Sequence, residues 1–269
     1  MKKDEHNRRR FINNALLLTS AAIALPAGTL QAAEQKQTAI SPNLKIRPKV
    51  LIFDVNETLL DLHLMNQTVA AALNGKKELL ALWFTTMLQY SLVATVGNHY
   101  EDFGAIGAAT LIMVAKNNGI NLTETQAKAA IQPILSLLPH PEVKTALTQL
   151  NKAGFKLVSL TNSSNKSVAI QFKNAGIDEL FEQSLSVEDI GKYKPHIDVY
   201  IWAARKIGVQ ASECMLIAAH GWEIAGAQWA GWRTAFIARP GQQLYPLAAL
   251  PEIDALDLSA LATQLISME

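Results

Sequence analysis

Short apolar runs alternate along much of this chain with longer segments whose apolar residues recur at helical spacing. Residues 50–53 (Val-Leu-Ile-Phe) have the length and composition of a strand buried on both faces of a parallel sheet. Further strands are predicted at 155–160, 184–187, 214–218 and 234–238, with helices at 142–153, 167–175, 198–207 and 223–230. This rhythm predicts an α/β fold with a doubly wound parallel sheet.

The region 61–138 interrupts the rhythm, because its apolar residues keep to helical spacing. One helical pattern runs up to Val96, where Gly97-Asn98 breaks it, and a second runs from Phe103 to Val114. A third is predicted to start at Thr123, in a sequence typical of a capping box, and to continue toward Leu138. We therefore predict a helical cap at 61–138, inserted into a core domain made of 48–60 and 139–269.

Residues 1–33 have the pattern of an export signal. A basic start ending in Arg8-Arg9-Arg10-Phe11 precedes the uncharged apolar stretch Ala15–Leu25 and then small residues up to Ala32-Ala33. The arginines resemble a bacterial twin-arginine signal, with an ordinary secretory signal as the alternative. The apolar stretch is shorter than the roughly 20 residues that span a bilayer. We therefore expect cleavage, no membrane anchor afterwards, a periplasmic location, and 34–47 as a flexible lead-in.

The amino-acid composition adds few constraints on the fold or the function. With 49% hydrophobic and 17% charged residues, the chain is typical of globular proteins, and its net charge of +1 gives no electrostatic footprint for nucleic acid. The single cysteine, Cys214, rules out an internal disulfide and lies in an apolar run typical of a buried thiol.

Polar residues follow the ends of several predicted strands. Asp54 and Thr58 follow the first strand, and Thr161-Asn162 the second; Lys194 precedes Pro195 in a loop, and His220 and Glu223 follow the strand 214–218. Because chemistry in open parallel sheets takes place beyond the carboxyl ends of the strands, these side chains are expected to converge. Simpler interpretations exist, with Asp54 as a turn former and Thr161-Asn162 as a helix cap.

The order of these residues resembles the haloacid dehalogenase-like hydrolase superfamily, over essentially all of 48–240. Within it, the type II 2-haloacid dehalogenases are most similar, and the motifs that carry this likeness are Asp54-x-x-x-Thr58, Tyr100-Glu101-Asp102-Phe103, Lys194-Pro195 with Tyr200, and Trp222-x-x-Ala225-Gly226-Ala227. The resemblance implies hydrolytic dehalogenation of short 2-haloalkanoic acids to 2-hydroxy acids, without a cofactor or metal. Because family dehalogenases are commonly dimeric, it also suggests a homodimer.

The resemblance also implies roles for individual residues. Asp54 is the nucleophile that forms an ester with the substrate, Lys194 keeps it ionised, and His220 or Glu223 is the base for the hydrolytic water. The remaining expected contacts, to the substrate or in support of the site, are Asn56, Thr58, Phe84, Phe103, Thr161, Asn162, Tyr200 and Trp222.

The sequence departs from the family pattern in three ways. Phe84 stands where type II dehalogenases carry an arginine that is thought to receive the halide, so Trp83, Asn98 and His99 are alternative halide contacts. His220 and Glu223 lie in a cluster that usually reads Ser-Ser-Asn-x-Trp-Asp. Asn56 occupies the place of the second aspartate with which superfamily phosphatases protonate the leaving group, while their nucleophile and late acids hold Mg²⁺. A Mg²⁺-dependent phosphatase and a catalytically inactive binding protein are therefore the alternatives.

Overall fold

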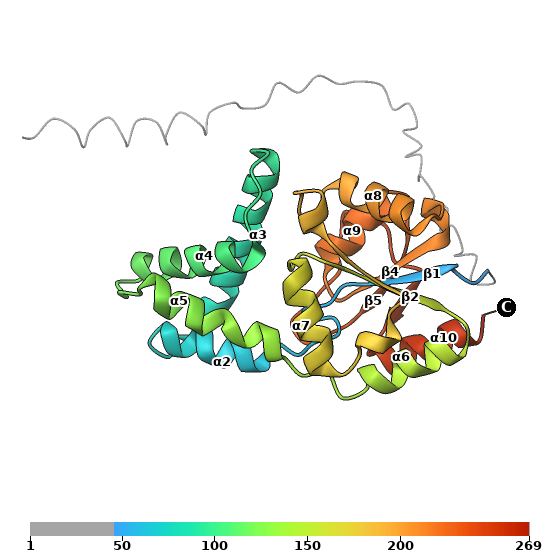
Figure 1. Cartoon of the computed structure of the whole chain (residues 1–269), viewed down its shortest axis with the longest axis horizontal. Coiled ribbons are helices and arrows are strands. Elements are labelled where there is room, and N and C mark those ends of the chain that lie inside the picture. Colours follow the sequence, from blue (N-terminus) through green and yellow to red (C-terminus); the bar gives the residue numbers. More distant parts are fainter. Residues whose placement is uncertain (1–45, 269) are drawn as a thin grey trace, which may run out of the picture. The chain divides into compact units, whose positions relative to one another are not determined.

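The computed structural model describes residues 46–268 and is built on one six-stranded parallel sheet (Figure 1). The strand order is β3-β2-β1-β4-β5-β6. Their bounds are β1 Val50–Phe53, β2 Lys156–Thr161, β3 Gln183–Ser186, β4 Cys214–Ala218, β5 Arg233–Ile237 and β6 Ile253–Ala255. All four residues of β1 are fully buried, as its position between two neighbouring strands requires. The predicted doubly wound α/β fold is confirmed.

Helices cover both faces of the sheet. On one face α6 packs against α10, and on the other α8 packs against α9 (Figure 1). The bounds of the core helices are α6 Val143–Lys152, α7 Asn165–Ala175, α8 Ile197–Ile207, α9 Gly221–Trp229 and α10 Leu258–Ile266. Because β1 pairs in parallel with both β2 and β4, the carboxyl ends of these three strands lie at the same edge of the sheet.

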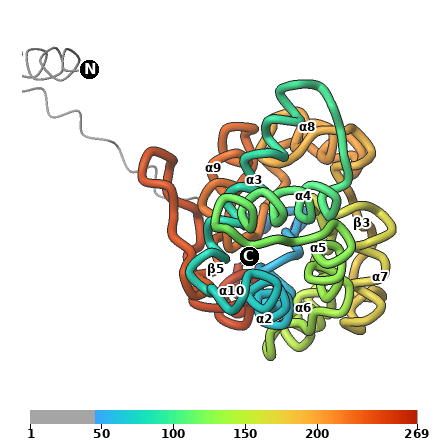
Figure 2. Tube along the Cα trace, turned by 90° about the vertical axis from the view of Figure 1, so that its left-hand side faces the viewer, coloured from blue at the N-terminus to red at the C-terminus, as the bar shows by residue number. Residues whose placement is uncertain are grey.

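The segment between β1 and α6 is helical and lies beyond that edge of the sheet (Figure 1). In Figure 2 the molecule is turned so that this helical segment faces the viewer. It consists of α2 His63–Ala72, α3 Leu80–Val96, α4 Phe103–Asn117 and α5 Glu124–Ile131, with short 3₁₀ turns at Lys77–Leu79 and Gln132–Ser136. Its two connections to the core pair with each other, with His140 N donating to Leu59 O at 3.0 Å and Asp61 N donating to Leu138 O at 2.9 Å. We call 61–138 the cap from here on.

Some predicted element boundaries were wrong. The first helical pattern of the cap is two helices, α2 and α3, because the chain turns at Gly75 with a φ of 79°. The third ends as an α-helix at Ile131, since Pro133 follows, whereas the predicted capping box at Thr123 is present. No strand or helix was predicted for the last 30 residues, where the structure has β6 and α10. The predicted export signal lies outside the described residues, as does all but the end of the predicted lead-in.

Candidate active site

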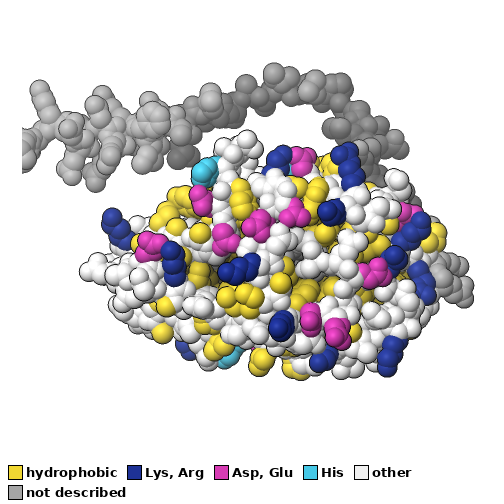
Figure 3. Space-filling view, in the orientation of Figure 1, with side chains coloured by type: hydrophobic (Ala, Val, Ile, Leu, Met, Phe, Trp, Pro, Cys, Tyr) yellow, Lys and Arg dark blue, Asp and Glu magenta, His cyan; other side chains and the backbone are white. Residues whose placement is uncertain are grey.

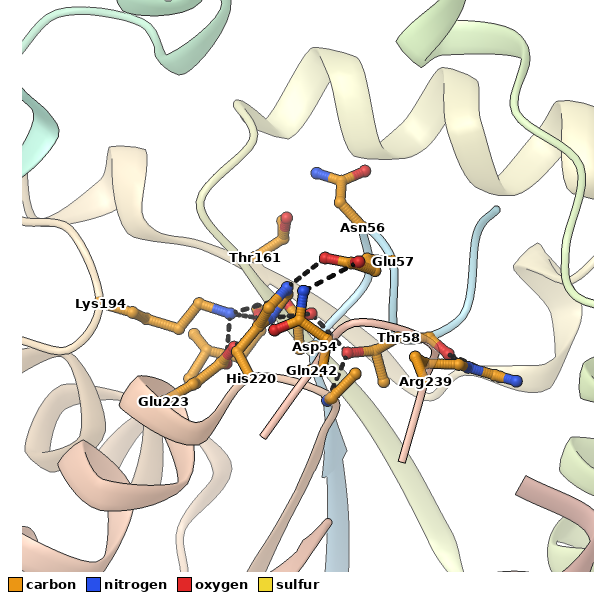
Figure 4. Close-up of polar contacts among 12 residues, drawn as sticks. Asp54, Asn56, Glu57, Thr58, Thr161, Lys194, His220, Glu223, Arg239 and Gln242 are labelled. Atoms are coloured by element: carbon orange, nitrogen blue, oxygen red, sulfur yellow. Dashed lines mark hydrogen bonds and ion pairs between the residues drawn. The ribbon is translucent and has the colours of Figure 1, made fainter. Parts of the chain in front are cut away.

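Asp54 lies directly after β1, at the centre of the converging strand ends, and is 6% exposed (Figure 4). Its Oδ1 accepts a hydrogen bond from Lys194 Nζ at 2.9 Å, and its Oδ2 accepts one from the Thr58 hydroxyl at 2.6 Å. Burial by itself would raise the pKa of this carboxyl, but the positive charges of Lys194 and His220 outweigh burial and hold the pKa well below its usual range. Asp54 is therefore an ionised carboxylate held in one orientation.

Lys194 is the buried cation that links two carboxylates. Its Nζ donates to Asp54, to Glu223 Oε1 at 2.6 Å and to Leu160 O at 2.6 Å, while its backbone N–H donates to Asn162 Oδ1. Burial would lower the pKa of Lys194, yet the two carboxylates overcome that effect and raise it. The proton therefore stays on Lys194 throughout the neutral range.

His220 lies on the other side of Asp54 and is 4% exposed. Its Nε2 is 2.9 Å from Glu57 Oε2, and its Nδ1 is 3.4 Å from both Asp54 Oδ2 and Glu223 Oε2. The rings of Phe84 and Trp222 stack on the imidazole, with centroid distances of 6.4 and 5.3 Å. Burial would lower the pKa of His220, but the surrounding carboxylates raise it well above its ordinary value, so His220 is an imidazolium.

Glu57 is a member of this site that the sequence analysis missed. Its backbone is in the left-handed region, with a φ of 67°, and its Oε1 accepts a hydrogen bond from Gln242 at 3.0 Å. Its carbonyl is 2.8 Å from His140 Nε2, so both ends of the residue are held. The available signal was a charged residue three positions after Asp54, in the turn that follows the first strand. Its partner His220 lies 163 positions away and could not be assigned to it from the sequence.

A cavity of about 50 Å³ lies between Asp54 and the cap. A single water requires about 10–15 Å³ by the same measure, so the space suits a substrate of only a few heavy atoms. Its polar lining consists of Asp54, Asn56, Asn162 and His220, and its apolar lining comes mostly from the cap. The predicted contacts Phe84, Phe103 and Trp222 are part of that apolar wall, together with Trp83, Met87 and Ile131.

Three of the predicted contacts support the site from outside or at the edge of this cavity. Asn56 lines it but uses its amide internally, donating to Ser163 Oγ and accepting from Gln171 Nε2. The Thr161 hydroxyl accepts a hydrogen bond from the backbone of Ser163, and the Tyr200 hydroxyl donates to Glu223 O. Neither Thr161 nor Tyr200 is among the lining residues.

Of the three alternative halide contacts, Trp83 alone lines the cavity. Asn98 and His99 are not lining residues, and the Trp83 side chain that does line the cavity donates its Nε1–H to Gly107 O at 2.9 Å. No lysine or arginine belongs to the lining of this cavity among residues 46–268.

The donor set does not fit the Mg²⁺ that a superfamily phosphatase would bind. Asp54, His220 and Glu223 bring three potential ligand atoms within 4.8 Å of one another. However, Mg²⁺ demands an octahedral set of oxygen ligands, and both carboxylates already bind the Lys194 ammonium and face the His220 imidazolium.

Comparisons with known proteins agree with this geometry. Residues 48–231 match the family described as haloacid dehalogenase-like hydrolases. The chain is 28% identical over 213 residues to an (S)-2-haloacid dehalogenase of Pseudomonas sp. (strain YL), covering 79% of this chain and 92% of that protein. It is 26% identical to haloacetate dehalogenase H-2 of Moraxella sp. (strain B), covering 76% and 92%. The structure of L-2-haloacid dehalogenase from Xanthobacter autotrophicus has the same fold, with a TM-score of 0.76 at 23% identity, covering 82% of this chain and all of that one.

Proposed function

The chain belongs to the haloacid dehalogenase-like hydrolases, and from that premise we propose that it hydrolyses the carbon–halogen bond of short 2-haloalkanoic acids. One observation carries the proposal: an ionised, immobilised Asp54 carboxylate faces a small and largely apolar cavity. Relatives named for the same reaction support it.

In the first step, a carboxylate oxygen of Asp54 attacks the carbon that carries the halogen. The new carbon–oxygen bond makes an ester, and the electron pair of the broken bond leaves with the halide. Lys194 and Thr58 hold Asp54 in place for this attack. The apolar cap wall excludes water, which leaves the carboxylate more reactive than it would be in solution.

In the second step, water attacks the carbonyl carbon of the Asp54 ester, releasing the 2-hydroxy acid and restoring the carboxylate. We assign the base to Glu223, because His220 is already protonated in the resting site. Glu223 Oε2 is buried and makes no hydrogen bond among the described residues, although it lies 3.4 Å from His220 Nδ1. Because Glu223 is not among the residues that line the cavity, we propose that the water reaches this oxygen beside Asp54.

The decisive experiment is halide release from 2-chloropropionate in EDTA, by the wild type and by Asp54→Asn. We expect release by the wild type, loss of at least roughly 10³-fold in the variant, and incorporation of ¹⁸O from labelled water into Asp54 in a single turnover. Phosphate release from an aryl phosphate that requires Mg²⁺, without halide release, would place the protein with the phosphatases. No product in either assay would favour a binding protein.

We also propose that the protein is exported to the periplasm by the twin-arginine machinery. The support is the sequence of residues 1–33, with its arginines, short apolar stretch and small residues. Replacing Arg8 and Arg9, the pair with Phe11 two positions on, with lysine should leave the full-length precursor in the cytoplasm. Unchanged periplasmic recovery of the processed chain would favour an ordinary secretory signal.

A homodimer is the third proposal, and α3 is the surface that supports it. The segment Lys77–Val96 is long and apolar enough to cross a membrane by length and composition, yet only 28% of its most apolar part is buried. Leu82, Thr85, Gln89, Leu92 and Val96 follow a three–four spacing along α3, which is the spacing of a helix–helix seam. Exposure reaches 55% at Val93 and 87% at Val96.

The seam is compatible with a second copy in antiparallel orientation. Centred on Gln89, such a pair places Leu82 opposite Val96 of the second copy and Thr85 opposite Val93, and α3 carries no charge that would repel itself. A membrane surface fits less well, because interfacial helices are usually rich in lysine and arginine. Acidic side chains gather on the face of the molecule that Figure 3 shows. Burial, and after it the negative charges of Glu188, Asp102 and Asp189, raise the pKa of Tyr100, which follows α3 in the chain.

Light scattering of the purified protein tests the dimer. Gln89→Lys would place two ammonium groups at the dimer axis and should give monomers, whereas Leu247→Lys, at an exposed residue outside the cap, should not. A wild type that is monomeric at micromolar concentration would contradict the proposal.

A further inference from the structure

The wall of the active-site cavity contains a hollow at Gly107, a buried glycine of α4 that belongs to the lining. A Cβ at this residue would lie 3.1 Å from Met87 Sδ, 3.7 Å from Ile131 Cδ1 and 3.9 Å from Trp83 Cζ2. All three of these neighbours also line the cavity. The place of the missing side chain is therefore part of the space that a substrate can use.

The backbone gives no reason for a glycine at this position. Gly107 lies inside α4 and is not among the glycines with a positive φ. Glycine in a helix interior costs roughly 0.5–1 kcal/mol relative to alanine, so the residue would be unfavourable unless its lack of a side chain is used. Its carbonyl accepts the Nε1–H of Trp83 at 2.9 Å, and Trp83 is only 1% exposed, so one side of the hollow is fixed in place.

The polar and apolar parts of the cavity come from different parts of the chain. The polar lining belongs to the core around Asp54, whereas the hollow is formed by residues of the cap helices α3, α4 and α5. A 2-haloalkanoic acid has the same division, because its carboxylate needs polar partners while an alkyl group on C2 is stabilised by apolar surroundings. With C2 beside Asp54 and the carboxylate among the polar groups, the alkyl group faces the cap.

We propose that the alkyl group on C2 of the substrate enters the hollow at Gly107, so that this glycine sets the largest 2-haloalkanoic acid that the enzyme accepts. This inference rests on the proposed dehalogenation. The cavity of about 50 Å³ has room for only a few water-sized groups, so one added methyl group removes a substantial share of it. A difference of one methylene group in an apolar pocket changes kcat/KM by roughly 10–200-fold.

Chloride release from 2-chlorobutyrate and chloroacetate by the purified full-length chain tests the proposal, because only 2-chlorobutyrate carries an alkyl group on C2. In Gly107→Ala we expect the ratio of kcat/KM for 2-chlorobutyrate to that for chloroacetate to fall at least tenfold. Adding Met87→Ala to this variant frees space beside the hollow and should bring the ratio back to within about threefold of the wild type. The matched control is Ala109→Leu, which adds volume on the exposed side of α4 and should keep the wild-type ratio.

The outcomes separate this inference from the function on which it rests. An equal loss for both substrates in Gly107→Ala would mean that Gly107 serves only the packing of α3 against α4, and it would overturn the inference. A loss that follows the halogen, between 2-bromobutyrate and 2-chlorobutyrate, would place the halide in the hollow and would also overturn it. No halide from any 2-haloalkanoic acid by the wild type would overturn the proposed function itself.

A second variant keeps the inference testable if Gly107→Ala does not fold, as judged by circular dichroism. Met87→Ala alone enlarges the hollow, and it should raise the ratio of kcat/KM for 2-chlorohexanoate to that for 2-chlorobutyrate at least tenfold over the wild type. An unchanged ratio in this variant would overturn the inference.

Discussion

At the scale of single residues, the distinctive feature of this site is an imidazolium surrounded by carboxylates. His220 adds a second positive charge beside Asp54, in addition to Lys194. It also touches Glu223, which we assign as the base, so the charge of His220 affects both steps of the proposed reaction. Glu57 orients the imidazole from its far nitrogen and is itself held by Gln242. Glu57 is therefore a positioning residue.

Replacing Glu57 with glutamine should lower the pKa of His220, because one of the three carboxylates that raise it is lost. We expect the alkaline limb of the kcat/KM profile to move down by about one pH unit. Glu101→Gln, at an exposed glutamate, serves as the control. An unshifted limb would mean that Glu57 acts only through packing.

In the proposed reaction the halide leaves against the aromatic and aliphatic side chains that line the cavity, among them Trp83 and Phe84. Phe84 stands where the resemblance expects an arginine. Fluoride loses far more hydration than bromide in such surroundings. We therefore expect bromoacetate to exceed fluoroacetate by at least roughly 10²-fold in kcat, beyond the ratio of their uncatalysed reactivities. Ion-selective electrodes measure both halides, and comparable rates would require a halide contact that this cavity does not provide.

At the scale of elements, the site depends on how closely α9 packs against the loop that carries Lys194. A Cβ at Gly226 of α9 would overlap Pro195, and it would lie 3.0 Å from the hydroxyl of Tyr200. The helix can approach this loop only because residue 226 has no side chain, and the approach brings Glu223 to Lys194.

Gly226→Ala should therefore displace Pro195 and, with it, Lys194. We expect a loss of about 1–3 kcal/mol in the free energy of unfolding and a larger proportional loss of kcat, roughly tenfold or more. Urea unfolding and halide release measure the two effects. Trp229→Ala, on the same helix at a side chain that is 62% exposed, should change neither. Equal activity in both variants would contradict the close-packing argument.

At the scale of the whole molecule, the buried charges link stability to pH. The pKa of His220 is higher in the folded protein than its ordinary value, so its contribution to stability is complete below about pH 6.5. As the pH rises above that value, the unfolded chain loses its proton while the folded chain keeps it. The contribution therefore declines until the folded pKa is passed.

We accordingly expect the melting temperatures of the wild type and His220→Asn to differ most near pH 6 and to converge toward pH 9. The charged groups that face the imidazole are Asp54, Glu57 and Glu223, and the Lys194 ammonium binds both Asp54 and Glu223. Thermal unfolding at constant ionic strength measures this difference. A difference that grows with pH would show that His220 is neutral when folded.

The sequence by itself determined the α/β core, the helical segment after the first strand, and the edge where polar residues gather. Each depends on a local pattern: fully apolar strands, helical spacing of apolar residues, and the direction of parallel strands. Asp54 could be identified in this way because its position after β1 is a local fact.

Only the tertiary structure decided which groups touch Asp54 and in which protonation state. The contacts of His220 with Glu57 and Phe84, and of Glu57 with Gln242, join residues from separate elements, and no periodicity links them. The charge of His220 likewise depends on burial and on three carboxylates brought together by folding. Sequence patterns report the environment of one element at a time, whereas this site is a property of distances between elements.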